Sequence, residues 1–129
     1  MYKIESVRTE RFGLQLLRLG LAAVFLWFGF SQLFNSLAWV DIVPGWAVSL
    51  AHLPPAMIVM MNGTMEVVLG TLMAMKIFVR TIAFILALHL LPIALSFGIT
   101  AIGVRDIGLS LASMSLALIY RKPAPVFEN

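Results

Sequence analysis

A carboxylate and a carboxamide stand one helical turn apart in the otherwise apolar stretch "NGTMEVVLG", from Asn62 to Gly70. Residues four apart share a face of an α-helix, so Asn62, Glu66 and Gly70 would lie in line. An ionised and unpaired glutamate is costly in hydrocarbon, so we expect Glu66 either to carry a proton or to have a partner. Such a group can bind a ligand, transfer a proton, or fix the register of two helices through a hydrogen bond.

Other isolated polar residues in the apolar segments could belong to the same site. Arg18 could pair with Glu66 from one side of the membrane, or Arg105 from the other. If their segments are helical, His89 and Glu66 would both lie about 13 Å from the same membrane surface. At equal depth they could share a proton or a hydrogen bond. The candidate residues for ligand or proton handling are Arg18, Gln32, Asn62, Glu66, His89, Arg105 and Asp106.

No residue pattern indicates a metal centre or an autonomous catalytic site. The chain has no cysteine, which excludes disulfides, thiolate zinc sites and cysteine-bound iron–sulfur clusters. Met57, Met61 and Met65 recur every four residues after His52, a set that Cu(I) accepts, but methionine is also an ordinary packing residue. We predict no metal site, no bis-histidine haem and, without a nucleophile–base motif or paired carboxylates, no independent enzyme activity.

The composition predicts that membrane-spanning helices position these residues. The 129-residue chain is 61% hydrophobic and 12% charged, whereas soluble domains are about 25% charged. Backbone groups in lipid must be hydrogen-bonded within the chain, and the alternation typical of membrane strands is absent. We predict an all-α fold, a four-transmembrane-helix bundle forming a single domain over residues 1–129. The expected helices cover residues of about 14–35, 56–75, 80–97 and 104–120.

Each expected helix has a polar or small-residue stripe, which we expect to face the inside of the bundle. The stripe of the first helix is Arg18, Ala22, Phe25, Gly29 and Gln32. The fourth helix has Asp106, Ser110, Ser113 and Ala117, and the third offers His89 and Ser96. Because these residues lie at several depths, the pattern predicts a polar seam or cleft rather than one compact site.

The basic residues predict the orientation in the membrane. All of the nine Lys and Arg residues except Arg105 lie on the side of the two termini, and the positive-inside rule places that side in the cytoplasm. We expect the first helix to be an uncleaved signal anchor and "RKPAPVFEN" to be a short exposed tail. A formal net charge of +3, with basic residues beside apolar segments, predicts no nucleic-acid binding.

The outer loop from Leu37 to Pro55 contains Trp39 and Trp46 but no Lys or Arg. Tryptophan favours the interface between lipid and water, so we expect both to be interface anchors. A short amphipathic segment is expected from Trp46 to His52, on or in the outer surface. The loop could be a plain connector or a lid over a pocket between the helices.

Five motifs succeed one another along the chain: "RLGLAAVFLWFGFSQLF", "AWVDIVPGW", "MNGTMEVVLGTLM", "ALHLLPIALSFG" and "VRDIGLSLASMSLAL". Their order and spacing, from about Arg18 to Leu118, resemble the DoxX family of small bacterial and archaeal membrane proteins. The resemblance implies a four-helix protein of the prokaryotic cytoplasmic membrane. Many members of the family have a lysine where this chain has Gln32.

The resemblance implies no single reaction, and three functions stay open. The first is a non-catalytic accessory, assembly or ligand-binding subunit, in a homo-oligomer or a larger complex, packed through Gly13, Gly20, Gly29, Gly63 and Gly70. The second is a quinone-linked oxidoreductase component, because some DoxX-like members are linked to quinone-dependent sulfur oxidation. No motif indicates a cofactor, but a quinone or a lipid could bind beside Glu66 and His89. The third is an oligomeric transporter of a small solute or of protons.

Overall fold

The computed structural model describes residues 1–121, and this part of the chain is helical without any β-strand. The elements are α1 (Tyr2–Phe34), the 3₁₀ helix η1 (Ser36–Ile42), α2 (Gly45–Ala51), α3 (Pro55–Ala74), α4 (Val79–Phe97) and α5 (Ala101–Ile119). Four of them, α1, α3, α4 and α5, are long and apolar enough to cross a membrane. The prediction of an all-α, four-helix membrane fold is confirmed. Except for Arg121, the expected tail lies outside the described residues.

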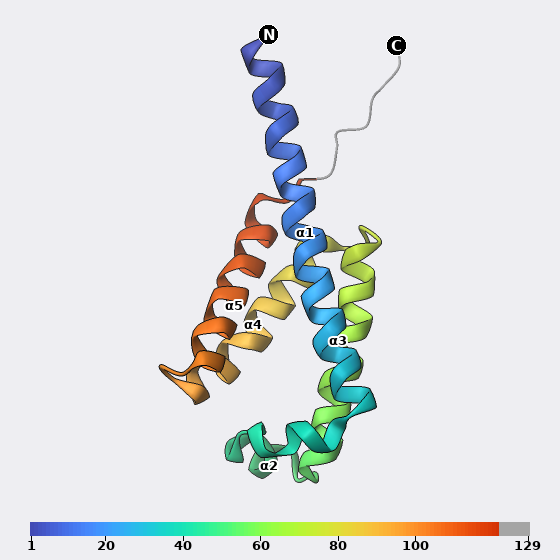
Figure 1. Ribbon diagram of the computed structural model, residues 1–129, viewed down its shortest axis with the longest axis vertical. Helices are drawn as coiled ribbons and strands as arrows, with labels where there is room; N and C mark the ends of the chain where they lie inside the picture. The colour runs from blue at the N-terminus through green and yellow to red at the C-terminus, as the bar shows by residue number, and fades with distance from the viewer. Residues whose placement is uncertain (122–129) are drawn as a thin grey trace.

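The long helices form two pairs, α1 with α3 and α4 with α5, with fewer contacts between the pairs (Figure 1). The N-terminus, the turn between α3 and α4, and the end of α5 lie at one end of the molecule, which we call the terminal end. The elements η1 and α2 and the connection between α4 and α5 lie at the other, which we call the loop end.

Helices α3, α4 and α5 have bounds close to the expected ones, but α1 begins at Tyr2 rather than near Leu14. Its 33 residues make a rod of about 50 Å, longer than the roughly 30 Å of bilayer hydrocarbon. The first turns of α1 therefore project beyond the other helices (Figure 1). The apolar run from about residue 14 predicted only the part of α1 that would lie within lipid. The charged segment before it contains no proline, so the helix continues.

The backbones of α1 and α3 approach each other at Gly29 and Gly63. A Cβ atom added to Gly29 would lie 2.8 Å from the carbonyl oxygen of Gly63, and one added to Gly63 would lie 2.8 Å from that of Gly29. Both positions therefore require glycine. These two glycines serve a contact within the chain, whereas Gly13 and Gly20 on α1 have open space beside them.

The buried apolar core lies toward the terminal end, where all four long helices meet. Its largest fully buried side chains are Phe25, Met73, Leu86 and Leu116. Close packing there leaves no room for a ligand. A site between the helices therefore has to lie toward the loop end.

The predicted inward stripes of α1, α3 and α5 are confirmed by burial, with Gln32, Glu66 and Asp106 among the buried side chains. Helix α4 differs, because its buried face is entirely apolar and Ser96 is exposed. The prediction of an inward His89–Ser96 stripe is wrong for Ser96. His89 lies half-buried at the edge of the apolar face.

Candidate functional site

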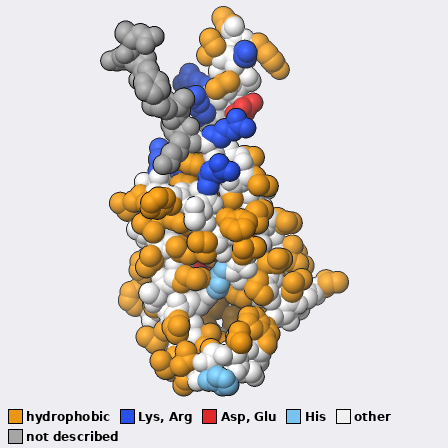
Figure 2. Space-filling view, turned by 180° about the vertical axis from the view of Figure 1, so that it is seen from behind, with side chains coloured by type: hydrophobic (Ala, Val, Ile, Leu, Met, Phe, Trp, Pro, Cys, Tyr) orange, Lys and Arg blue, Asp and Glu red, His pale blue; other side chains and the backbone are white. Residues whose placement is uncertain are grey.

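A pocket of about 320 Å³ lies in the half of the bundle nearer the loop end, between the two helix pairs and beside the outer loop. In the space-filling view the surface is hollowed beside a histidine side chain (Figure 2). The volume falls within the roughly 300–1,000 Å³ of small-molecule sites. The walls are mainly apolar and include the aromatic side chains Phe25, Phe28, Trp39, Trp46 and Phe97.

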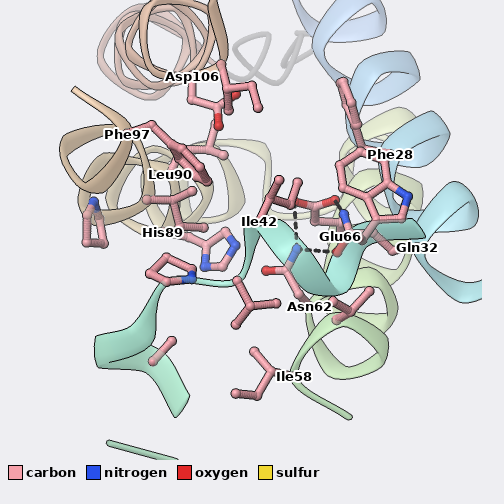
Figure 3. Close-up of a pocket in the computed structure, with 18 of the residues that line it drawn as sticks. Phe28, Gln32, Ile42, Ile58, Asn62, Glu66, His89, Leu90, Phe97 and Asp106 are labelled. Atoms are coloured by element: carbon pink, nitrogen blue, oxygen red, sulfur yellow. Dashed lines mark hydrogen bonds between the residues drawn. The ribbon is translucent and has the colours of Figure 1, made fainter. Parts of the chain in front are cut away.

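Three polar side chains from α1 and α3 form a closed cluster on one wall of the pocket (Figure 3). Gln32 donates through Nε2 to Glu66 Oε2 at 3.0 Å. Asn62 donates through Nδ2 to Gln32 Oε1 at 2.7 Å and to Glu66 Oε1 at 3.2 Å. Glu66 is only 4% exposed and Gln32 only 6%. We call these residues the Gln32–Asn62–Glu66 cluster.

Neither of the two arginines considered as partners pairs with Glu66, since both hydrogen-bond partners of this carboxylate in the described chain are neutral amides. Arg18 lies at the terminal end, away from the pocket lining. Its Nη1 donates to the carbonyl oxygens of Met73 at 2.9 Å and Ala74 at 2.6 Å, where α3 ends. The guanidinium thus meets the negative end of the α3 dipole rather than the polar cluster.

Arg105 and Asp106, both on α5, line the pocket as an ion pair. Arg105 Nε donates to Asp106 Oδ1 at 2.8 Å. The guanidinium carbon also lies 4.5 Å from the centroid of the Phe28 ring, a cation–π contact that joins α5 to α1. Arg105 is therefore paired with its own neighbour in the sequence rather than with Glu66.

His89 on α4 lies across the pocket from the Gln32–Asn62–Glu66 cluster (Figure 3). His89 and Glu66 line the same pocket, which agrees with the similar depth expected for them. The expected hydrogen bond between the two side chains is not present in the described chain. His89 Nε2 is buried and has no hydrogen-bond partner. Buried polar atoms normally have a partner, so this nitrogen marks a position where a ligand or a water molecule would bind.

The outer loop lies across the mouth of the pocket at the loop end. Trp39 of η1 donates through Nε1 to Ser31 Oγ on α1 at 3.1 Å. Trp46 of α2 donates through Nε1 to Ser96 Oγ on α4 at 2.6 Å. Both tryptophans also line the pocket, and α2 coincides with the expected amphipathic segment. The contacts favour the lid over the plain connector, because the loop bridges one helix of each pair.

The sequence reasoning overlooked Phe28, which lines the pocket and contacts both Arg105 and Trp39. Phe28 precedes Gln32 by one helical turn, and this spacing could have identified it. Within residues 1–121 no group of three or more His, Asp or Glu side chains could hold a metal ion. The methionines Met60, Met61 and Met65 border a shallow depression on the outside of α3.

One of three comparisons with known proteins gave a match, and it covers most of the bundle. A family model described as DoxX matches residues 13–99. A comparison with curated proteins and one with solved structures each gave no match. The matched residues include the Gln32–Asn62–Glu66 cluster, the lid tryptophans and His89. With four helices able to cross a membrane and a family match over most of its length, the chain is a multi-pass membrane protein and belongs to the DoxX family.

Proposed function

We propose that this protein is a ligand-binding or accessory subunit of a membrane complex, and that its ligand is a small, mostly apolar compound. The pocket at the loop end carries this proposal, because apolar and aromatic walls with a few convergent polar groups are typical of small-molecule sites. The lid formed by η1 and α2 supports it, since the two tryptophan hydrogen bonds hold the loop over the pocket.

Filling the pocket is expected to displace the ligand. Ala47 lines the pocket from α2, so Ala47→Phe would place a benzyl group in the cavity. The purified variant should retain much less of any small molecule that the parent carries, measured by organic extraction and mass spectrometry per mole of protein. Ala38→Phe is the matched control, because Ala38 is exposed on η1 and does not line the pocket. Equal retention by the parent and Ala47→Phe would contradict a ligand site here.

A quinone-linked role is the second candidate, supported by the unpartnered Nε2 of His89 in the pocket wall. A quinone needs an apolar slot and hydrogen-bond groups at its carbonyl oxygens, and the histidine N–H could supply one of them. The same extract tests this candidate through the redox difference spectrum of the released compounds. Absence of quinone, together with no binding of an added short-chain quinone, would overturn it.

The proposed complex is a homo-oligomer or a larger membrane assembly. Gly13 and Gly20 support it, because their open faces would let another helix approach α1 closely. The mass of the protein purified in a mild detergent tests it. A monomer without a co-purifying protein would contradict this part of the proposal.

We infer that both termini are cytoplasmic in a prokaryotic cell membrane, because Lys and Arg side chains gather at the terminal end (Figure 2). The chain has no cysteine, so a single introduced thiol reports one position. In intact cells a membrane-impermeant maleimide should label Ser49→Cys on α2 and leave Glu10→Cys on α1 unlabelled. Both positions are exposed, and both should react after lysis. The reverse labelling pattern would contradict the orientation.

A further inference from the structure

The charges in the pocket do not balance when Glu66 is ionised. The other titratable or charged groups in the described lining are His89 from α4 and the Arg105–Asp106 pair from α5, while α1, η1 and α2 contribute none. Arg105 and Asp106 compensate each other across 2.8 Å. When His89 is neutral, Glu66 is thus left as an uncompensated negative charge within an apolar cavity.

The hydrogen bonds around Glu66 nevertheless suit the ionised form. Each carboxylate oxygen accepts from an amide, Oε1 from Asn62 and Oε2 from Gln32. Two donors on two oxygens match a carboxylate, which only accepts hydrogen bonds, better than a protonated acid, which must also donate one. The cluster therefore prepares a negative charge, and no Lys or Arg side chain in the described lining is free to pair with it.

The walls of the pocket suit a cation with apolar substituents. Aromatic ring faces attract cations, and cages of aromatic side chains recognise quaternary ammonium groups. One such contact already exists here, since the Arg105 guanidinium lies over the Phe28 ring. Trp39 and Trp46 of the lid and Phe97 of α4 add further rings to the lining.

We propose that the ligand of this pocket is a lipophilic organic cation, a quaternary ammonium or a protonated amine with apolar substituents, whose charge pairs with the Glu66 carboxylate. This proposal rests on the proposed function, that the pocket holds a small molecule. Without the cation, a proton on Glu66 removes the cost of an unpaired buried charge. Binding then releases that proton to the medium, so one positive charge replaces another.

The first test compares two probes of nearly the same shape, the cation phenyltrimethylammonium and its neutral isostere tert-butylbenzene. Binding is measured by equilibrium dialysis against the full chain in nanodiscs, with empty nanodiscs correcting for partition into lipid. The parent protein should bind the cation about ten-fold or more tightly than the isostere, because only the cation compensates the carboxylate. Its affinity should rise with pH by up to about ten-fold per pH unit, the limit for exchange of one proton.

The second test uses Glu66→Gln, which keeps the side-chain volume and removes the charge. This variant should bind the cation about ten-fold or more weakly than the parent and should lose the pH dependence, while binding tert-butylbenzene as the parent does. Asp41→Asn is the matched control, because Asp41 is an exposed carboxylate of η1 outside the pocket lining. It should bind both probes like the parent.

A measurement on the parent protein keeps the proposal falsifiable if Glu66→Gln does not fold. In weakly buffered solution with a pH indicator, each bound cation should release up to one proton, and the neutral isostere none. Binding of the isostere without preference for the cation would overturn the cationic ligand and leave the proposed pocket function intact. Binding of neither probe would overturn the pocket function itself.

Discussion

Replacement of Gly63 with leucine is expected to lower the stability of the bundle by about 3 kcal/mol or more, the upper range for overpacking a close contact. An added Cβ would lie 2.8 Å from the Gly29 carbonyl oxygen and 2.9 Å from the Cβ of Gln32. Neither neighbour is the free end of a flexible side chain. Helices α1 and α3 would have to separate along the line where they make most of their mutual contacts.

Thermal unfolding in a mild detergent, followed by circular dichroism and tryptophan fluorescence, measures this effect. Gly108→Leu is the matched control, because a Cβ on Gly108 has nothing within 4 Å and the residue lies on α5, outside the α1–α3 contact. The control should unfold close to the parent, within about 0.5 kcal/mol, as is usual for exposed positions. Equal melting temperatures of the parent and Gly63→Leu would show that α1 and α3 do not pack as described.

The same contact determines where the polar cluster lies. Because Gln32 is next to Gly63 across the α1–α3 contact, any separation of these helices moves the amide that donates to Glu66. Gly63 thus connects the stability of the bundle to the geometry of the site. A smaller change, Gly63→Ala, should weaken binding of phenyltrimethylammonium while most of the fold remains.

The sequence predicted the helices and most of their inward faces, because the physics involved is local. Long apolar runs must be helical in lipid, and a period of about 3.6 residues decides which side chains share a face. The burial of Gln32, Glu66 and Asp106 follows from those two rules. The start of α1 at Tyr2 does not, because the polar segment that precedes the apolar run carries no comparable signal.

The partners of Glu66 could not be predicted, because they depend on how the helices rotate and cross. When each helix is considered by itself, the side chain of Arg18 or of Arg105 could reach the Glu66 carboxylate. The glycine contact between α1 and α3 instead brings Gln32 beside Glu66, and Arg105 is already paired with Asp106. For a similar reason the sequence could not distinguish a lid from a plain connector, since tryptophans at a membrane interface and tryptophans over a pocket have the same sequence pattern.

Arg18 offers the other large effect, because its guanidinium is buried and no carboxylate within residues 1–121 pairs with it. The residue is 3% exposed, and its Nη1 bonds the last carbonyl oxygens of α3, those of Met73 and Ala74. Arg18→Met keeps an apolar stem of similar length and removes the donors. We expect a loss of about 2–3 kcal/mol, the range for losing charged hydrogen bonds to buried acceptors.

Unfolding in mild detergent measures this loss against Arg11→Met, a change at an exposed arginine of the same helix. Arg18→Lys should recover part of the stability, because an ammonium keeps the charge at the C-terminus of α3 but does not reproduce the guanidinium fork. Stability of Arg18→Met equal to that of Arg11→Met would contradict a role in joining α1 to α3.

Arg80 repeats this arrangement on the other helix pair, where its Nε donates to the Ala117 carbonyl oxygen near the end of α5 at 3.1 Å. Helices α3 and α5 both end at the terminal end, and each meets an arginine from the other helix of its pair. Two of the basic residues from which we infer the orientation in the membrane, Arg18 and Arg80, therefore also donate hydrogen bonds to carbonyl oxygens at helix C-termini. Arg80→Met should accordingly destabilise the α4–α5 pair and leave Glu66 and its amide partners in place.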